Sequence, residues 1–312
     1  MKPHICCYAS AHLPAIRRAP STSRVVLGYT ELFMDLQQAP ELDFFVDPLP
    51  NLDGDARAAH EFLQLALDDE DEPIVDLVRT LGQHAAFATE ILARQCRTFI
   101  FSISMCGSST RLLRWDRSGC VVTESFDIRE HPELLCEFLW RFSQASSAGR
   151  GHDPTVQLAS NEEQSLFQSV ISRAIRDQLE LDDIGMGEAL RQHYEPGRVY
   201  VVDVLRQGSS TSTHNVRRYL VSRPVISPLS FVGRGTRGYW AVDVATHAVT
   251  FLKDTWRFRA IKELEAETLQ RLNDLKVRYV PFPAWYGDVC DLPGPALFPS
   301  GMCYSSCHHL RC

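Results

Sequence analysis

Three glycines and one lysine are the residues of this 312-residue chain whose spacing suggests chemistry. Gly233, Gly235 and Gly238 form the pattern G-x-G-x-x-G, and Lys253 follows the first of them by 20 positions (253 − 233). The runs on either side of the glycines are typical of strands, and a third strand is expected to end at Lys253. A glycine loop in a hairpin can cover nucleotide phosphates, and a lysine at the end of the third strand can pair with them.

The same glycine pattern also occurs where a strand leads into a helix and binds a dinucleotide. Here the glycines are followed by Tyr239-Trp240-Ala241-Val242, which is aromatic and β-branched and therefore favours a strand. The alternative that stays open is a β-hairpin that binds no nucleotide.

A helix is predicted next, from Ile261 to Leu275, because apolar residues recur there at helical spacing. In the arrangement described above, a glutamate of this helix holds the lysine. Glu265 is the residue predicted for that role, with Glu263 and Glu267 as close competitors. The predicted cofactor-binding residues are therefore Gly233, Gly235, Gly238, Lys253 and Glu265.

Four segments of the chain resemble the fungal-type protein kinases (FunK) of mushroom-forming fungi. The segments are GRGTRGYWAVD, FLKDTWR, RTFIFSISMCGSSTRLLRWDRSGCVVTESFD and RGHDPT. The resemblance covers Gly82 to Tyr286, roughly two thirds of the chain. It implies a kinase fold behind an α+β region of the family's own, with ATP-dependent phosphotransfer to serine or threonine of a protein.

The sequence departs from the kinase pattern after Lys253. Kinase chemistry needs an H-R-D-like aspartate, an asparagine and an Asp-Phe-Gly aspartate that holds magnesium. None of these motifs occurs in the 59 residues that follow Lys253 (312 − 253), and Asp291-Leu292-Pro293-Gly294 comes too early and contains a proline. We therefore expect a truncated kinase with no catalytic and no metal-binding residue and a weak or incomplete ATP site. Magnesium is expected only with a complete carboxy-terminal lobe, and a gene-model artefact, an isoform and a degenerate copy stay open as causes.

Charge and composition limit the other function classes. The net charge is −7, with a net of +4 in residues 1–30 and a net of −12 in residues 31–80 (2 − 14). We therefore expect no nucleic acid partner, and no run of 18 apolar residues suggests a membrane span. The ten cysteines are scattered, which favours reduced, buried thiols and an intracellular protein of the cytoplasm or nucleus. The expected partners are a nucleotide and a protein substrate or partner.

The predicted fold class is α+β, with a kinase-like amino-terminal lobe of antiparallel sheet and one helix, and the carboxy-terminal lobe missing. Val277 to Asp288 is predicted to form the fourth strand of the lobe. The predicted segments are a disordered leader (1–30), an acidic irregular segment (31–73), a helix, β-meander and helix region (74–145), a linker (146–155), the kinase-like lobe (156–290) and an irregular tail (291–312).

Three further groups of residues invite a functional interpretation. Asp35, Asp43 and Asp47 are expected to lie on a solvated acidic face rather than to bind a metal. Arg114, Asp116 and Arg117 are expected to serve a hairpin turn and surface ion pairs. The last ten residues match no defined metal site, and a non-native tail is expected there; its possible ligands are Cys303, Cys307, His308, His309 and Cys312.

The alternative function is that of an interaction or regulatory protein without catalysis. Residues 74–145 would then be its binding module, because no nucleophile with a base occurs among them.

Overall fold

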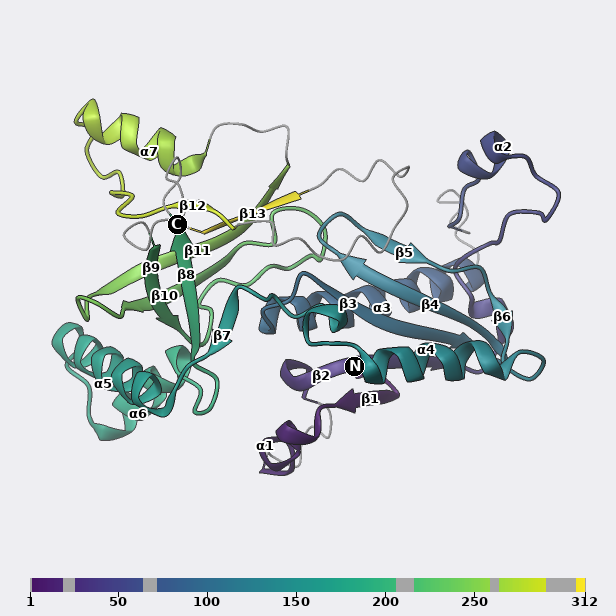
Figure 1. The fold of residues 1–312 in the computed structure, drawn as a ribbon, viewed down its shortest axis with the longest axis horizontal. Coiled ribbons are helices and arrows are strands. Elements are labelled where there is room, and N and C mark those ends of the chain that lie inside the picture. Colours follow the sequence, from purple (N-terminus) through teal and green to yellow (C-terminus); the bar gives the residue numbers. More distant parts are fainter. Residues whose placement is uncertain are drawn as a thin grey trace. The chain divides into compact units, whose positions relative to one another are not determined.

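The structure is a computed structural model, and it describes residues 2–18, 26–63, 72–205, 216–258, 264–289 and 307–311. The chain divides into two compact units, Met1–His152 and Asp153–Cys312. Each unit contains one sheet, and seven α-helices lie among the described residues, so the predicted mixture of helices and strands is confirmed (Figure 1). Within the described residues, no helix is long and apolar enough to cross a membrane.

The first unit is built on a six-stranded sheet with the order β1-β2-β3-β4-β5, in which β6 also pairs with β4. Its strands are β1 (Ile5–Tyr8), β2 (Thr30–Gln37), β3 (Phe99–Cys106), β4 (Ser109–Asp116), β5 (Cys120–Val122) and β6 (Phe126–Asp127). Its helices are α1 (Leu13–Arg18), α2 (Gly54–Ala58), α3 (Glu72–Arg94) and α4 (Pro132–Gln144). Strands β2 and β3 are parallel, and α3 forms the crossover that such a connection requires.

The two long helices of the first unit cover opposite faces of its sheet. His84 of α3 reaches Ser102 of β3, whereas Phe138 and Phe142 of α4 contact Phe101. Successive side chains of a strand point to opposite faces, so α3 and α4 must lie on different sides. The α3 side holds a closed apolar core, while no residue of α4 is fully buried.

A buried charged network joins the start of β2 to the end of the unit. Arg97 donates to Glu31 at 2.9 Å, and His152 lies 3.0 Å from the same carboxylate. Burial alone raises the pKa of Glu31, but the hydrogen bond from His152 and the charge of Arg97 outweigh it and lower that pKa to about 2. Gly151, with a positive φ of 94°, lies so close to the Phe99 carbonyl that a Cβ would collide with it. The predicted linker 146–155 is therefore anchored to the sheet rather than a loose connector.

Several predictions for the first 73 residues are wrong. The predicted disordered leader contains β1, and the segment predicted to be irregular contains β2, which pairs with β1 on one side and β3 on the other. The pattern ELFMDLQ, which the sequence left open between a strand and a short helix, is a strand, and its Glu31 and Asp35 are buried. The predicted helix, β-meander and helix region 74–145 is thus only part of the first unit.

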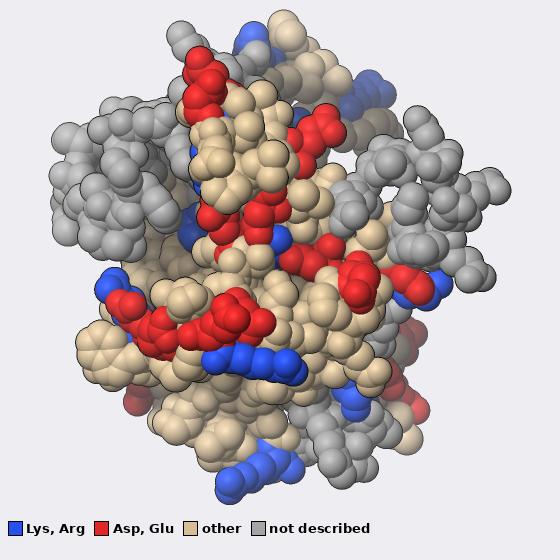
Figure 2. Space-filling model, turned by 90° about the vertical axis from the view of Figure 1, so that its right-hand side faces the viewer, with Lys and Arg blue, Asp and Glu red and all other residues tan. Residues whose placement is uncertain are grey.

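The predicted solvated acidic face is also wrong for the three aspartates assigned to it. Acidic side chains do gather on the face that Figure 2 shows, but Asp35 is buried and lies 2.8 Å from His4 Nδ1. Asp43 and Asp47 both accept hydrogen bonds from Arg111, at 2.7 and 2.5 Å. These carboxylates therefore anchor an irregular segment to β4, because a buried arginine needs compensating acceptors.

Of Arg114, Asp116 and Arg117, only the first two form the predicted surface ion pair. Arg114 and Asp116 form an ion pair at 2.7 Å with both side chains about a quarter exposed. Arg117 is instead buried and donates to the Leu92 carbonyl at the end of α3.

The second unit contains an antiparallel, seven-stranded sheet with the order β12-β13-β11-β10-β9-β8-β7. Its strands are β7 (Val156–Leu158), β8 (Tyr200–Leu205), β9 (Val216–Val221), β10 (Arg237–Asp243), β11 (Val249–Phe258), β12 (Gly287–Asp288) and β13 (Cys307–Arg311). Its helices are α5 (Asn161–Gln178), α6 (Asp183–His193) and α7 (Glu265–Asp274). Ser160 and Glu163 form a capping box at the start of α5, and α5 packs an apolar face on the sheet.

Four predictions for the second unit need correction. Strand β11 continues to Phe258 beyond the predicted end at Lys253. Residues 277–286 form turns and irregular chain, and only Gly287–Asp288 pair as a short strand. Residues 227–236, which include the run predicted as a strand before the glycines, are irregular. The predicted irregular tail contains β13, which pairs with β11, while Cys303 and Cys312 lie outside the described residues.

No disulfide joins the cysteines that the structure describes in the first unit. They are less uniformly buried than expected: Cys106 is buried, Cys136 on α4 is exposed, and Cys6, Cys7, Cys96 and Cys120 are intermediate. Burial raises the pKa of the Cys106 thiol to about 11, so it stays protonated at neutral pH.

The buried network predicts a large cost for removing its arginine. Arg97→Met should lower the free energy of unfolding by about 3 to 5 kcal/mol, because Glu31 would remain buried without its main partner. Arg79→Met, which removes an exposed arginine paired with Asp76, should change it by less than about 1 kcal/mol. Urea denaturation of both variants would measure the difference, and equal effects would contradict the structural role of Arg97.

The buried imidazole of His84 predicts a specific dependence of stability on pH. Complete burial lowers its pKa from 6.5 to about 3, so the unfolded chain binds the proton more readily than the folded chain. The stability contributed by the neutral imidazole is therefore complete above pH 6.5 and decreases as the pH falls towards 3. Between pH 6.5 and 4.5 the wild type should lose about 2 kcal/mol more than His84→Leu.

A matched control for the pH experiment is Phe33→Leu, which perturbs a ring packed against His84 without removing a titratable group. Its free energy of unfolding should be lower than that of the wild type by a constant amount across the same pH range. A His84→Leu slope equal to that of the wild type would show that the imidazole does not titrate on unfolding.

Candidate functional site

The candidate site is built on the hairpin of β10 and β11. Asp243 ends β10, and its carboxylate accepts hydrogen bonds from the amides of Ala245 and Thr246, which stabilise the turn between β10 and β11. The register that results places Gly238 directly opposite Lys253. Opposite residues of an antiparallel pair share one face of the sheet, so the predicted glycine and lysine lie side by side.

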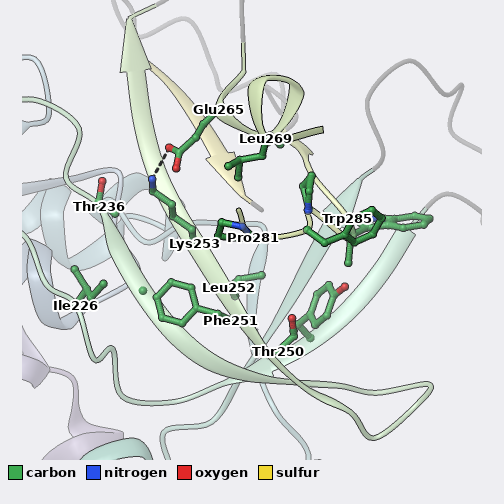
Figure 3. A pocket seen from close by; sticks show the side chains of 16 residues that line it. Ile226, Thr236, Thr250, Phe251, Leu252, Lys253, Glu265, Leu269, Pro281 and Trp285 are labelled. Carbon is green, nitrogen blue, oxygen red and sulfur yellow. Dashed lines mark hydrogen bonds and ion pairs between the residues drawn. The ribbon is translucent and has the colours of Figure 1, made fainter. Parts of the chain in front are cut away.

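Helix α7 supplies the glutamate of the site. Glu265, the first residue of the helix, forms an ion pair with the Lys253 ammonium, as the dashed line in Figure 3 shows. Glu267, the competing candidate, instead accepts a hydrogen bond from the Leu264 amide at 3.0 Å and stabilises the start of the helix. Glu263 and the predicted helix start at Ile261 lie outside the described residues. The sequence-based choice of Glu265 thus agrees with the geometry.

The three glycines have different local environments. Gly233 and Gly235 have positive φ values of 95° and 48°, which favour glycine in the irregular loop before β10. Gly238 lies in β10, where an added Cβ would come within 2.5 Å of Phe251 Cζ and 3.2 Å of Ile226 Cδ1. Gly238 therefore leaves room for the Phe251 ring beside Lys253.

A pocket of about 400 Å³ lies next to the Lys253–Glu265 pair. Its volume is within the usual range for small-molecule sites. Its walls come from β10, β11, α7 and the segment Pro281–Trp285, as the side chains in Figure 3 show. Gly238, Lys253 and Glu265 line it, whereas Gly233 and Gly235 do not. The lining residues are Tyr219, Ile226, Thr236, Gly238, Thr250, Phe251, Leu252, Lys253, Glu265, Ala266, Leu269, Pro281, Phe282, Pro283, Ala284 and Trp285.

Two features beside the pocket were not found from the sequence. The segment Pro281–Trp285 was predicted as part of a strand, but it forms one pocket wall and is held by Trp285, whose indole donates to the Val204 carbonyl. Arg217 lies over the same indole at 4.9 Å from its centroid. Two prolines around Phe282 were the available signal against a strand.

A buried ion pair fixes the hairpin next to the site. Arg237 of β10 donates to Asp254 of β11 at 2.5 Å, and each side chain is at most 5% exposed. Tyr219 lines the pocket, and burial raises the pKa of its phenol, so it offers a neutral hydroxyl at neutral pH. Among the residues that line the described pocket, Lys253 is the one with a positively charged side chain.

No metal centre is found among the described side chains, where no three His, Cys, Asp or Glu residues are grouped as ligands. The tail residues considered for metal binding cannot be assembled into a site from this structure, because Cys303 and Cys312 fall outside its described ranges.

Comparison with known proteins identifies the chain. The family model described as fungal protein kinase matches residues 61–290, which is most of the chain. The chain therefore belongs to the fungal protein kinase family, and the resemblance seen in the sequence is confirmed. No curated protein and no solved structure gives a significant match.

The exposure of the Lys253–Glu265 pair predicts that it contributes little to stability. The two side chains are 27% and 45% exposed, and solvated pairs of this kind contribute up to about 1 kcal/mol. Lys253→Met should therefore change the free energy of unfolding by less than about 1 kcal/mol, as should Lys276→Met at an exposed position beyond α7. Chemical denaturation would measure both, and a much larger loss for Lys253→Met would mean that the pair holds α7 on the sheet.

Proposed function

We propose that this protein is a kinase-like ATP-binding protein whose nucleotide site is the pocket beside Lys253. The observation that carries the proposal is the Lys253–Glu265 ion pair at the wall of a pocket of suitable size. In kinases such a pair holds the lysine where it meets the α and β phosphates. Membership of the fungal protein kinase family supports the same role.

The chemical parts of the pocket have separable roles. Lys253 would meet the phosphates, and the apolar wall of Leu252, Leu269 and Pro281 would take the base. The amides of the loop around Gly233 and Gly235 would cover the phosphates, although these glycines are not among the residues that line the pocket. A site with one cationic group and one apolar wall is expected to bind ATP weakly.

Phosphotransfer to serine or threonine of a protein requires more than these residues. Catalysis in kinases depends on an aspartate that orients the acceptor hydroxyl and on magnesium held by aspartate and asparagine. Residues 254–312 contain no H-R-D-like or Asp-Phe-Gly segment, so these groups would have to come from a carboxy-terminal lobe. We therefore propose nucleotide binding for this chain and transfer only together with such a lobe.

Thermal unfolding with and without nucleotide tests the proposal. If the dissociation constant is about 1 mM, ATP at about 10 mM should stabilise the wild type by roughly 1.4 kcal/mol and raise its melting temperature by a few degrees. Lys253→Met should lose most of this shift, because the phosphates would lose their cationic partner.

The matched control is Lys276→Met, which removes the same charge from an exposed position outside the pocket lining. It should retain the wild-type shift at the same ionic strength. Equal shifts in the wild type and in Lys253→Met would contradict nucleotide binding at this pocket.

A second candidate is a binding role for the first unit, which includes the predicted module of residues 74–145. The observation in its favour is α4, on which Leu134 is 42% and Trp140 is 65% exposed. Large exposed apolar side chains on a helix can mark a protein contact. Under this alternative, Trp140→Ala would abolish partner capture while Lys253→Met would not affect it.

A further inference from the structure

The connection between α5 and α6 carries large apolar side chains that the fold does not bury. Residues 176–184 are all exposed to solvent. The large apolar ones among them are Leu179, Leu181 and Ile184, which are 49%, 41% and 80% exposed. Together with the first turns of α6 they form a surface that we call the α5–α6 corner, residues 177–188. Apolar side chains gathered on an exposed surface mark a contact site for another molecule.

The packing of α6 explains why Ile184 remains outside the core. Met186, Ala189 and Leu190 of α6 pack against the buried apolar cluster to which α5 contributes. Ile184 precedes Met186 by two residues, which is roughly 200° around a helix, so it points away from that cluster. The fold therefore holds α6 in place without using the side chain of Ile184.

The charge of the α5–α6 corner is strongly negative. Residues 177–188 contain five carboxylates and no lysine, arginine or histidine, a net charge of −5 (0 − 5). Arg176 directly precedes them, and Glu188 forms an ion pair with Arg191 at 3.5 Å. Within the part of the chain that the structure describes, no ion pair neutralises Asp177, Glu180 or Asp183.

A small pocket lies beside the corner. It measures about 50 Å³ and is lined by Gln178, which directly precedes Leu179, and by His193 and Trp240. Trp240 is 41% exposed, and the buried His193 Nδ1 has no hydrogen-bond partner among the described residues. Because a water molecule needs roughly 10–15 Å³ of such volume, the pocket has room for one small side chain. A molecule that covers the corner can therefore also anchor a side chain next to Trp240.

Charge decides which class of molecule fits the corner. Nucleic acids and anionic membranes carry negative charge and are repelled by a surface of this kind. In a symmetric dimer of this chain the same patch would meet itself, so the carboxylates of the two copies would repel each other. A partner with both apolar and basic side chains is complementary to the exposed apolar residues and to the carboxylates.

We propose that the α5–α6 corner binds a basic amphipathic segment of a partner protein. The apolar side chains of that segment cover Leu179, Leu181 and Ile184, and its lysines and arginines face the surrounding carboxylates. Burial of the apolar groups supplies affinity, whereas the exposed charges select the partner and increase the association rate. The proposal rests on this surface alone and does not require nucleotide binding.

The probe is the fluorescein-labelled peptide Leu-Lys-Lys-Leu-Leu-Lys-Lys-Leu-Leu-Lys-Lys-Leu. Its leucines form one face of a helix and its lysines form the opposite face. Two control peptides separate the two kinds of contact: one has glutamate in place of every lysine, and the other has serine in place of every leucine. Fluorescence anisotropy with the full chain measures all three.

We expect the leucine–lysine peptide to bind at least roughly tenfold more tightly than either control. Its binding should weaken severalfold when the salt concentration rises from about 50 mM to about 300 mM, because exposed charges are screened. Binding of either control as tight as that of the probe, or no binding of the probe at about 1 mM, would overturn the proposal.

Charge reversal in the protein tests the carboxylates directly. The double variant Glu180→Lys/Asp183→Lys should bind the probe at least roughly tenfold more weakly than the wild type, while Asp182 stays unchanged because it caps α6. The matched control Glu61→Lys/Glu130→Lys changes the net charge equally at exposed positions of the first unit and should bind like the wild type. Equal losses in both variants would mean that only net charge matters, which contradicts a site at the corner.

Serine substitutions test the apolar contacts in the same assay. Leu181→Ser/Ile184→Ser should weaken probe binding at least roughly tenfold, whereas Leu229→Ser/Leu275→Ser, which changes two leucines that are 99% and 75% exposed, should not. Circular dichroism checks that each variant is folded. Equal binding by the two variants would contradict the proposal. So would a dimer of the wild type in analytical ultracentrifugation that Leu181→Ser/Ile184→Ser converts to a monomer, because a second copy would then occupy the corner.

Discussion

The antiparallel register of β10 and β11 is the constraint on which the candidate site depends. Because Gly238 pairs with Lys253, the lysine lies on the same face of the sheet as the Phe251 ring. Position 238 must be a glycine, since a Cβ there would collide with that ring. A slip of one residue would turn Lys253 to the other face of the sheet, because side chains alternate along a strand. The Asp243 turn and the buried Arg237–Asp254 pair lie at the two ends of this register and hold it.

The ion pairs of the protein divide by burial into two kinds with different consequences. Arg97–Glu31 and Arg237–Asp254 are almost fully buried, so losing one partner leaves a charge without water, which is costly. Lys253–Glu265 is solvated, and the fold gains little from it. In the proposed nucleotide site this pair would serve to orient the lysine at the pocket wall.

The sequence predicted those parts of the molecule whose signals are local. The hairpin and the pairing of Lys253 with Glu265 each depend on residues close together in the chain. The position of β2 in the sheet could not be predicted in this way, because it depends on pairing with β3 more than 60 residues later. The acidic composition around β2 suggested solvent exposure, and only the distant Arg111 shows why Asp43 and Asp47 lie inward.

The pocket wall formed by Pro281–Trp285 also could not be predicted, because its position depends on a residue that is distant in the sequence. A run of aromatic residues suggested a strand, but Trp285 is positioned by a carbonyl of β8, 81 residues away in sequence. The local evidence against a strand was Pro281 and Pro283, because a proline has no N–H to donate to a neighbouring strand.

The glycine pattern that first suggested nucleotide binding has a local explanation at each of its three positions. Gly233 and Gly235 adopt positive φ values in an irregular loop, and Gly238 makes room for Phe251. None of these local reasons involves a phosphate, so the requirements of the fold are enough to explain the three glycines. The proposal of a nucleotide site therefore depends on Lys253, Glu265 and the pocket that they line together with Pro281, rather than on the glycine pattern.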